Sequence, residues 1–156
     1  MKGDPEIIEA LNAVLTAELT AINQYFIHHK MADNWGYKRI SAHKRGESIE
    51  EMKHADEVIE RILYFDGVPN MQRLNPVMVG ESVVEMHELD LQLEYDNVKR
   101  LNDAIALCLE KKDGGTRELL ERILVEEEEA VDYLEAQLGL IKELGRERYL
   151  SEQMHE

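Results

Sequence analysis

Four glutamates stand at positions where a helical chain of this pattern should carry apolar residues: Glu18, Glu51, Glu94 and Glu127. Each lies on a stripe of apolar residues repeating in three- and four-residue steps, the pattern of an amphipathic helix. The interval from Glu18 to Glu51 equals that from Glu94 to Glu127, so the chain has two similar halves. Carboxylates in a dry core are costly unless they are paired. The pattern therefore predicts that something cationic binds between the helices.

Helical segments are expected to make up almost the whole chain, because only three prolines and nine glycines interrupt 156 residues. Asp4 before Pro5 is a helix start signal, and Ser82 with Glu85 forms a capping-box pattern. We expect four helices over about residues 5–34, 36–65, 82–112 and 116–144, and a short fifth helix over 146–154. The third is expected to place Leu91, Glu94, Val98, Leu101 and Ile105 on its buried face.

The segment from Asp66 to Gly80 contains two prolines and two glycines and has no helical period. A connection of this length can run along a whole bundle, whereas a short loop makes neighbouring helices antiparallel. We therefore expect one domain over residues 1–156 with an all-α fold. Its architecture should be an up-down-down-up four-helix bundle with one long crossover.

Composition excludes several functional classes. The net charge of −15 and the shortness of basic segments such as Lys44-Arg45 argue against nucleic-acid binding. No apolar stretch approaches the roughly 18 residues needed to cross a bilayer, and the N-terminus lacks the apolar core of a signal peptide. The lone Cys108 permits no internal disulfide. We expect a cytoplasmic protein that binds neither nucleic acid nor membrane.

A pair of divalent metal ions is the simplest cationic partner for the four glutamates, since their four positive charges balance four carboxylates. His54 lies one turn after Glu51 on the same helix face and adds a nitrogen ligand without adding charge. The candidate catalytic and metal-binding residues are thus Glu18, Glu51, His54, Glu94 and Glu127.

The second half of the site lacks a histidine. His54 stands three residues after Glu51, but the matching position three residues after Glu127 is Ala130. Glu126 and Glu128 lie about 100° to either side of Glu127 around the helix, so neither is expected to replace it. We expect carboxylates and water to hold the second metal, with reduced affinity and a reduced oxidation rate.

The ligand pattern is that of ferritin-like di-iron proteins, in which two helices each supply a Glu and two supply Glu-x-x-His. Over nearly its whole length the chain resembles bacterioferritin, the haem-containing ferritin of bacteria. The metal positions carry this resemblance together with four segments: MKGDP at 1–5, AINQYFIHHKM at 21–31, ESIEEMKHADEVIERIL at 47–63 and VDYLEAQLGLI at 131–141.

The resemblance implies a ferritin-like bundle in a hollow 24-subunit shell that stores iron as a ferric mineral. Each subunit would be a ferroxidase, oxidising Fe(II) with O2 or H2O2 at a di-iron centre. Glu51 and Glu127 would bridge the two irons, Glu18 and Glu94 would be terminal ligands, and His54 would complete one iron. Tyr25 resembles the family's tyrosine beside this centre.

The resemblance also implies haem b at a twofold interface, held axially by Met52 from two subunits. Met52 is rotated about 100° from Glu51 and so points away from the core stripe, as an interface residue would. The implied partners are a homo-oligomer built from haem-bridged dimers, or a hetero-oligomer with a paralogue, and a reductant of the ferredoxin type.

Two alternatives stay open at the level of sequence. Ala130 together with the retained Met52 fits a haem-carrying or structural subunit that co-assembles with a catalytic paralogue. The same bundle also supports a peroxide-reducing or oxygenase-like di-iron enzyme. Five further histidines are expected to be packing or surface residues without chemistry: His28, His29, His43, His87 and His155.

Overall fold

The computed structural model describes residues 1–156 and contains five helices and no strands. The helices are α1 (Pro5–Asn34), α2 (Lys38–Tyr64), α3 (Val83–Glu110), α4 (Gly114–Leu144) and α5 (Arg146–Ser151). This confirms the predicted fold class, an all-α four-helix bundle with a long crossover and a short fifth helix. None of the helices is both long and apolar enough to cross a membrane.

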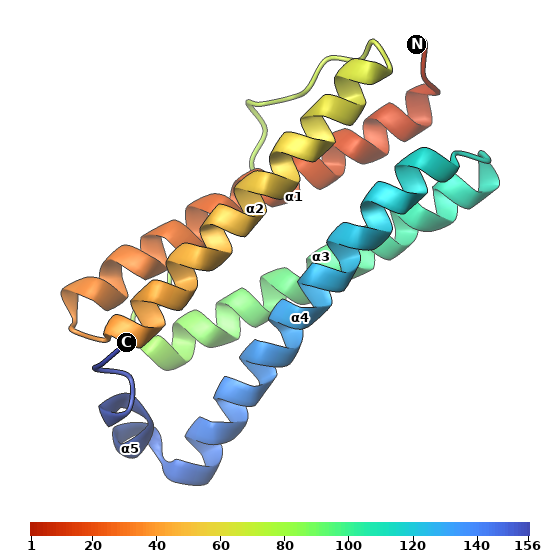
Figure 1. Cartoon of the computed structure of the whole chain (residues 1–156). Helices are drawn as coiled ribbons and strands as arrows, with labels where there is room; N and C mark the ends of the chain where they lie inside the picture. Colours follow the sequence, from red (N-terminus) through yellow and green to blue (C-terminus); the bar gives the residue numbers. More distant parts are fainter.

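Two antiparallel helix pairs make up the bundle: α1 packs mainly on α2, and α3 on α4 (Figure 1). The segment between α2 and α3 returns along the bundle, so that these two helices run in the same direction. The N-terminus lies at one end, and α5 with the C-terminus lies at the other. The order is thus up, down, down, up.

The helix starts follow local capping. The side chains of Asp4 and Ser82 accept hydrogen bonds from the backbone N–H groups of Glu6 and Glu85, as the sequence pattern predicts. Two starts differ from the expected positions 36 and 116. α2 begins only at Lys38, because Gly36 adopts a positive φ of 90° in the preceding turn. α4 begins already at Gly114, because Asp113 caps it through the N–H of Thr116.

The apolar core is divided into two parts. The larger part lies where the start of α1 and the end of α2 pack on α3 and α4, and it includes Leu11, Ile62, Leu101 and Leu120. The smaller part is at the other end, where Tyr149 of α5 joins Ala32, Ile40 and Val83. The buried residues between these parts are largely polar, including Glu18, Gln24, Lys44 and Glu51.

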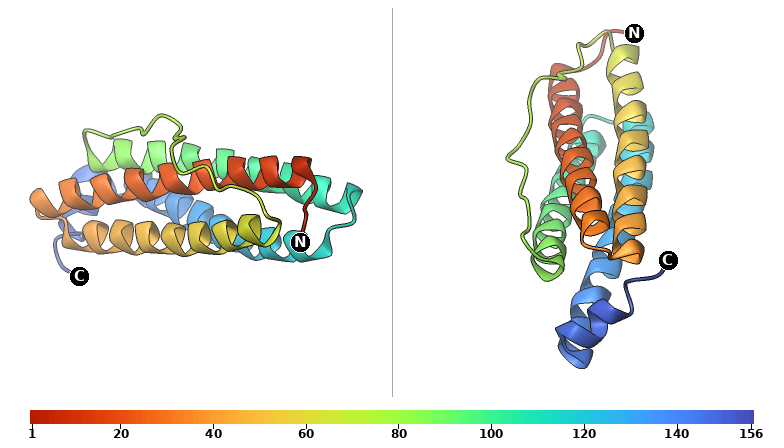
Figure 2. Two further views of the ribbon diagram at one scale, coloured as in Figure 1. Left: turned by 90° about the horizontal axis from the view of Figure 1, so that it is seen from above. Right: turned by 90° about the vertical axis from the view of Figure 1, so that its left-hand side faces the viewer.

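A row of polar side chains on α1 holds the crossover at four-residue intervals. Figure 2 shows the crossover running along the outside of α1 and α3. Asn12 Oδ1 accepts from the N–H of Asn70, and Thr20 Oγ1 accepts from that of Asn75. Gln24 and His28 accept in the same way from the N–H groups of Met78 and Gly80, while Thr16 accepts from the side-chain Nε of Arg73. Since residues four apart share one helix face, this row gives the crossover a continuous set of partners.

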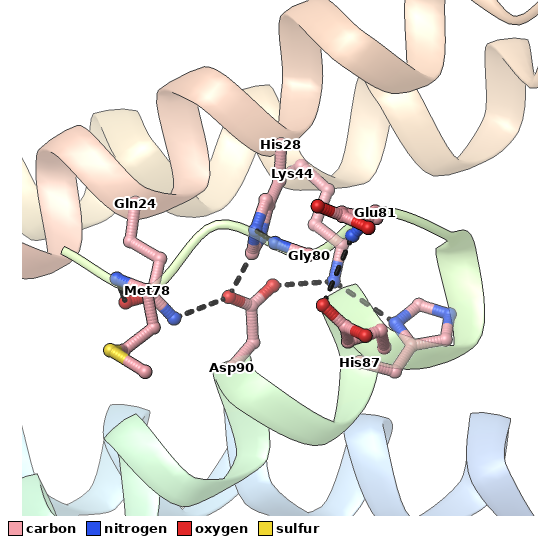
Figure 3. Close-up of polar contacts among 9 residues, drawn as sticks. Gln24, His28, Lys44, Met78, Gly80, Glu81, His87 and Asp90 are labelled. Carbon is pink, nitrogen blue, oxygen red and sulfur yellow. Dashed lines mark hydrogen bonds and ion pairs between the residues drawn. The ribbon is translucent and has the colours of Figure 1, made fainter.

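A buried polar network joins the end of this row to α2 and α3 (Figure 3). The Lys44 ammonium group, which the sequence pattern placed in a basic segment, is fully buried and lies 2.7 Å from Asp90 Oδ2. Asp90 Oδ1 also accepts from Gln24 and contacts His28 Nδ1, each at 2.9 Å. His87 lies between Lys44 and the hydroxyl of Tyr149, which extends the network to α5.

Candidate metal centre

The buried acidic residues of the bundle converge at its middle. Glu18 from α1, Glu51 and His54 from α2, and Glu127 from α4 place one potential ligand atom each within 4.8 Å of the others. His54 Nδ1 lies 3.1 Å from Glu127 Oε1, 3.4 Å from Glu18 Oε2 and 3.9 Å from Glu51 Oε2. Three helices therefore direct carboxylates at one edge of a single imidazole.

Glu94 on α3 lies beside this group of four rather than within it. Its side chain is completely buried, burial raises its pKa, and among the charged groups Glu127 raises that pKa most. The Tyr25 ring is also buried, and the charge of Glu94 acts on its hydroxyl. All five predicted ligand positions thus face one buried region, with Glu94 and Tyr25 on its α1–α3 side.

The ligand atoms of this region have almost no hydrogen-bond partners within the protein. The unpartnered atoms are one oxygen each of Glu18 and Glu51, both oxygens of Glu94 and Glu127, His54 Nδ1 and the Tyr25 hydroxyl. Buried polar groups are nearly always hydrogen-bonded, so a cluster of exceptions calls for a bound partner. Carboxylates with one imidazole suit divalent iron, manganese or zinc, and the residues present therefore fit a bound metal.

Electrostatics shows how strongly these carboxylates resist ionising together. Burial and the neighbouring carboxylates raise the pKa of Glu51 and Glu94 well above the usual range, and burial together with Glu127 raises that of Glu18. Burial opposes ionisation of Glu127 as well, but Glu94 and His54 outweigh it and lower its pKa to about 2. Burial alone would lower the pKa of His54, yet Glu127 and Glu18 raise it to about 11. Cations are strongly favoured here.

A cavity of about 680 Å³ opens beside the centre between α2 and α4. Glu51 and His54 reach it from the inside, while Ala130 contributes only a methyl group to its wall. His43 and Tyr133 stack with ring centroids 3.5 Å apart on the same wall. Four further glutamates line the cavity, so its surface attracts cations: Glu47, Glu50, Glu126 and Glu129.

Met52 lies on the outer face of α2, with 56% of its surface exposed. Ile49, three residues earlier on the same helix face, and Phe26 on α1 are also exposed apolar residues. The Met52 thioether is therefore accessible from outside the bundle, on an exposed apolar stretch of α2.

Two features of the site were not predicted from the sequence. Glu126 was weighed only as a replacement for the missing histidine, yet its carboxylate contacts His54 Nε2 at the edge of the cavity. Lys44 is fully buried and pairs with Asp90, so its charge does not balance the glutamates. It stands four residues after Ile40 and three before Glu47, so the spacing that marked the buried glutamates also placed Lys44 on the inner face of α2. The sequence shows four consecutive glutamates from Glu126 to Glu129. The angular position of a residue on a helix does not, however, show how far its flexible carboxylate reaches.

Comparison with known proteins agrees with this geometry. Residues 8–144 match the model of the ferritin family, described as a ferritin-like domain. The chain is 51% identical over 149 residues to a bacterioferritin of Mycobacterium bovis, covering 96% of this chain and 94% of that protein. It is 49% identical to a bacterioferritin of Streptomyces coelicolor, covering 97% and 90% of the two chains. For one of Brucella melitensis the identity is 43%, with 96% and 92% covered. The chain belongs to the bacterioferritin family.

Proposed function

We propose that this protein stores iron and oxidises Fe(II) to Fe(III) at the buried centre. The observation that carries the proposal is the set of buried carboxylate oxygens without hydrogen-bond partners around His54 Nδ1. Lys44, the one buried lysine, is engaged by Asp90, so His54 is the only side chain among them that can carry a positive charge. Membership of the bacterioferritin family supports the same reading.

In this proposal Glu51 and Glu127 bridge two Fe(II) ions, while Glu18 and Glu94 are terminal ligands and His54 Nδ1 completes one ion. The iron is substrate and cargo. Each Fe(II) gives up one electron, so two ions together convert O2 and two protons to H2O2, or H2O2 and two protons to water. Holding both at one site avoids releasing a one-electron radical.

Ala130 makes the two iron positions unequal. An alanine methyl cannot coordinate, and Glu94 and Glu127, both buried, are the remaining ligands on that side. Water would complete the coordination of this iron. We propose that the second iron is bound more weakly than the first and that the oxidation rate is correspondingly reduced.

Storage requires an assembly, which we propose to be the cytoplasmic 24-subunit shell that the family resemblance implies. Met52 of two subunits would hold one haem b between them, and axial thioether ligation raises the reduction potential of a haem. The haem would supply electron-transfer chemistry, and a ferredoxin-type reductant is the partner we propose for the release of stored iron.

Stopped-flow spectroscopy tests the proposal. Aerobic addition of Fe(II) to the purified oligomer should give a rapid phase that saturates at no more than two irons per chain. Glu18→Ala should abolish that phase, whereas Glu60→Ala, at an exposed position of α2, should leave it intact.

A second candidate function rests on Ala130 in a chain that keeps Met52. Such a chain could be a haem-carrying subunit that co-assembles with a catalytic paralogue. Haem in the visible spectrum without any saturable iron phase would favour this candidate and contradict ferroxidase activity of the chain by itself.

A further inference from the structure

His54 lies between two groups of carboxylates, one at each ring nitrogen. Its Nδ1 faces the buried centre, 3.1 Å from Glu127 Oε1 and 3.4 Å from Glu18 Oε2. Its Nε2 faces the cavity and contacts Oε2 of Glu126. Glu126 is half-exposed on α4, 72 residues further along the chain. The two edges of the ring therefore meet different environments: a buried group of potential ligands, and a single carboxylate at the surface.

A neutral imidazole carries one proton, and the hydrogen bond made by one nitrogen decides which nitrogen is free to bind a metal. A carboxylate that accepts the proton of the other nitrogen fixes the tautomer and ring orientation and raises the basicity of the ligand. We propose that Glu126 is such a positioning residue: it accepts the Nε2 proton of His54 and thereby presents Nδ1 to the centre. This inference rests on the proposed metal-binding function.

Glu126 is better placed for this role than the other carboxylates of the cavity. Glu50 also has an oxygen within 4.8 Å of His54 and Glu126, but it is paired with Lys53 at 3.2 Å and makes no hydrogen bond to the ring. Glu129 lines the cavity but forms neither a hydrogen bond nor an ion pair with His54. Ala130, one turn after Glu126 on α4, has no polar atom to offer.

The same contact argues against Glu126 as a direct substitute for the missing second histidine. A carboxylate that accepts a proton from Nε2 is directed at the outer edge of the ring, whereas the unpartnered oxygens of Glu94 and Glu127 lie on the inner side. Glu126 therefore acts on the first metal position through His54, and the second position stays without a replacement.

Titration of the metal-free oligomer with Co(II), followed by visible absorption, tests the role without any turnover. Glu126→Leu removes the acceptor and should lower the affinity of the His54 position about 10- to 100-fold, the usual effect of losing such a partner. The number of Co(II) ions bound per chain should not change. Glu126→Gln keeps an oxygen that accepts from Nε2–H, so it should recover a large part of the loss. Glu129→Leu, on the same helix and cavity wall, is the matched control and should bind as the unmodified protein does.

Three results with the variants would overturn the inference. Unchanged affinity in Glu126→Leu would show that the contact does not support His54. Loss of one whole equivalent of Co(II), with the remaining one bound normally, would make Glu126 a direct ligand of the second metal. Failure of Glu126→Gln to recover any affinity would exclude hydrogen-bond acceptance as the cause. If the unmodified protein bound no Co(II), the proposed metal centre would itself be wrong, and this inference with it.

Discussion

Single residues decide how the two charged clusters inside this bundle differ. Asp90 is balanced within the protein by Lys44, His28 and Gln24, so its network is complete. The glutamates around His54 have only this one imidazole among them, and their oxygens lack partners. Protein groups alone satisfy the first cluster, whereas the second keeps unpartnered oxygens that are suited to a bound cation.

Restoring the missing imidazole should strengthen the weaker metal position. Ala130→His would direct a ring from the cavity wall toward Glu127, and we expect at least about a tenfold gain in affinity for the second Co(II), since even indirect partners contribute 10- to 100-fold. Titration of the metal-free oligomer measures it. Ala130→Gln, which adds bulk but no imidazole, is the control. Equal affinities in all three proteins would show that the second position does not depend on residue 130.

The pH dependence of stability should report the buried acids. The pKa of Glu94 is raised well above the usual value, so at pH values between the two the folded chain binds a proton that the unfolded chain has lost. The contribution of Glu94 to the free energy of unfolding of the metal-free protein is therefore retained at low pH and decreases as the pH rises. The melting temperature of the unmodified protein relative to Glu94→Gln should fall as the pH rises above the ordinary glutamate pKa of 4.5.

Calorimetry at several pH values measures this difference, with the exposed Glu60→Gln as control. The control should differ from the unmodified protein by a constant amount. Adding Zn(II) at neutral pH should raise the melting temperature of the unmodified protein more than that of Glu94→Gln, because a cation replaces the proton. A relative melting temperature that rises with pH would contradict the assignment of Glu94 as a buried acid with a raised pKa.

At the scale of whole elements, the Lys44–Asp90 pair joins three helices and the crossover. Lys44→Met leaves Asp90 as a buried charge without its cation, which typically costs about 3–5 kcal/mol. Adding Asp90→Asn removes that charge while keeping an acceptor for Gln24, so the double variant should be more stable than Lys44→Met. Guanidinium unfolding at fixed protein concentration measures both.

The matched control for this pair is Lys53→Met. Lys53 is exposed and pairs with Glu50 at the surface, so its loss should cost no more than about 1 kcal/mol. Equal destabilisation by Lys44→Met and Lys53→Met would mean that the buried network does not hold the elements together.

At the scale of the whole molecule, Met52 is expected to link two subunits through haem. Leucine keeps the apolar volume but has no sulfur ligand, so Met52→Leu should lose the haem absorption while size-exclusion chromatography still shows the assembled oligomer. Met71→Leu, at an exposed methionine of the crossover, is the control and should keep its haem. Undiminished haem content in Met52→Leu would rule out axial ligation by this residue.

Periodicity made the helices and the buried glutamates predictable, because both follow from positions close together in the chain. The caps at Asp4 and Ser82 and the apolar steps around Glu18, Glu51 and Glu127 act within one or two turns. The third helix shows the limit of that method. Leu91 and Val98 were expected on its buried face, but Asp90 and Asn97 are the more deeply buried residues. At Asp90, polar partners from α1 and α2 hold the side chain inside, so the buried face lies one residue from the expected position there.

The sequence by itself therefore determined the all-α class, the crossover and the acidic interior, since helix propensity and hydrophobic spacing are local properties. Only the tertiary structure decided which polar side chains meet. Lys44 finds Asp90 across 46 residues, the polar row on α1 finds the crossover across more than 50, and His54 finds Glu126 across 72. Such pairings depend on how two distant helices pack and how far a flexible side chain reaches, and neither quantity is written in the spacing of residues along one helix.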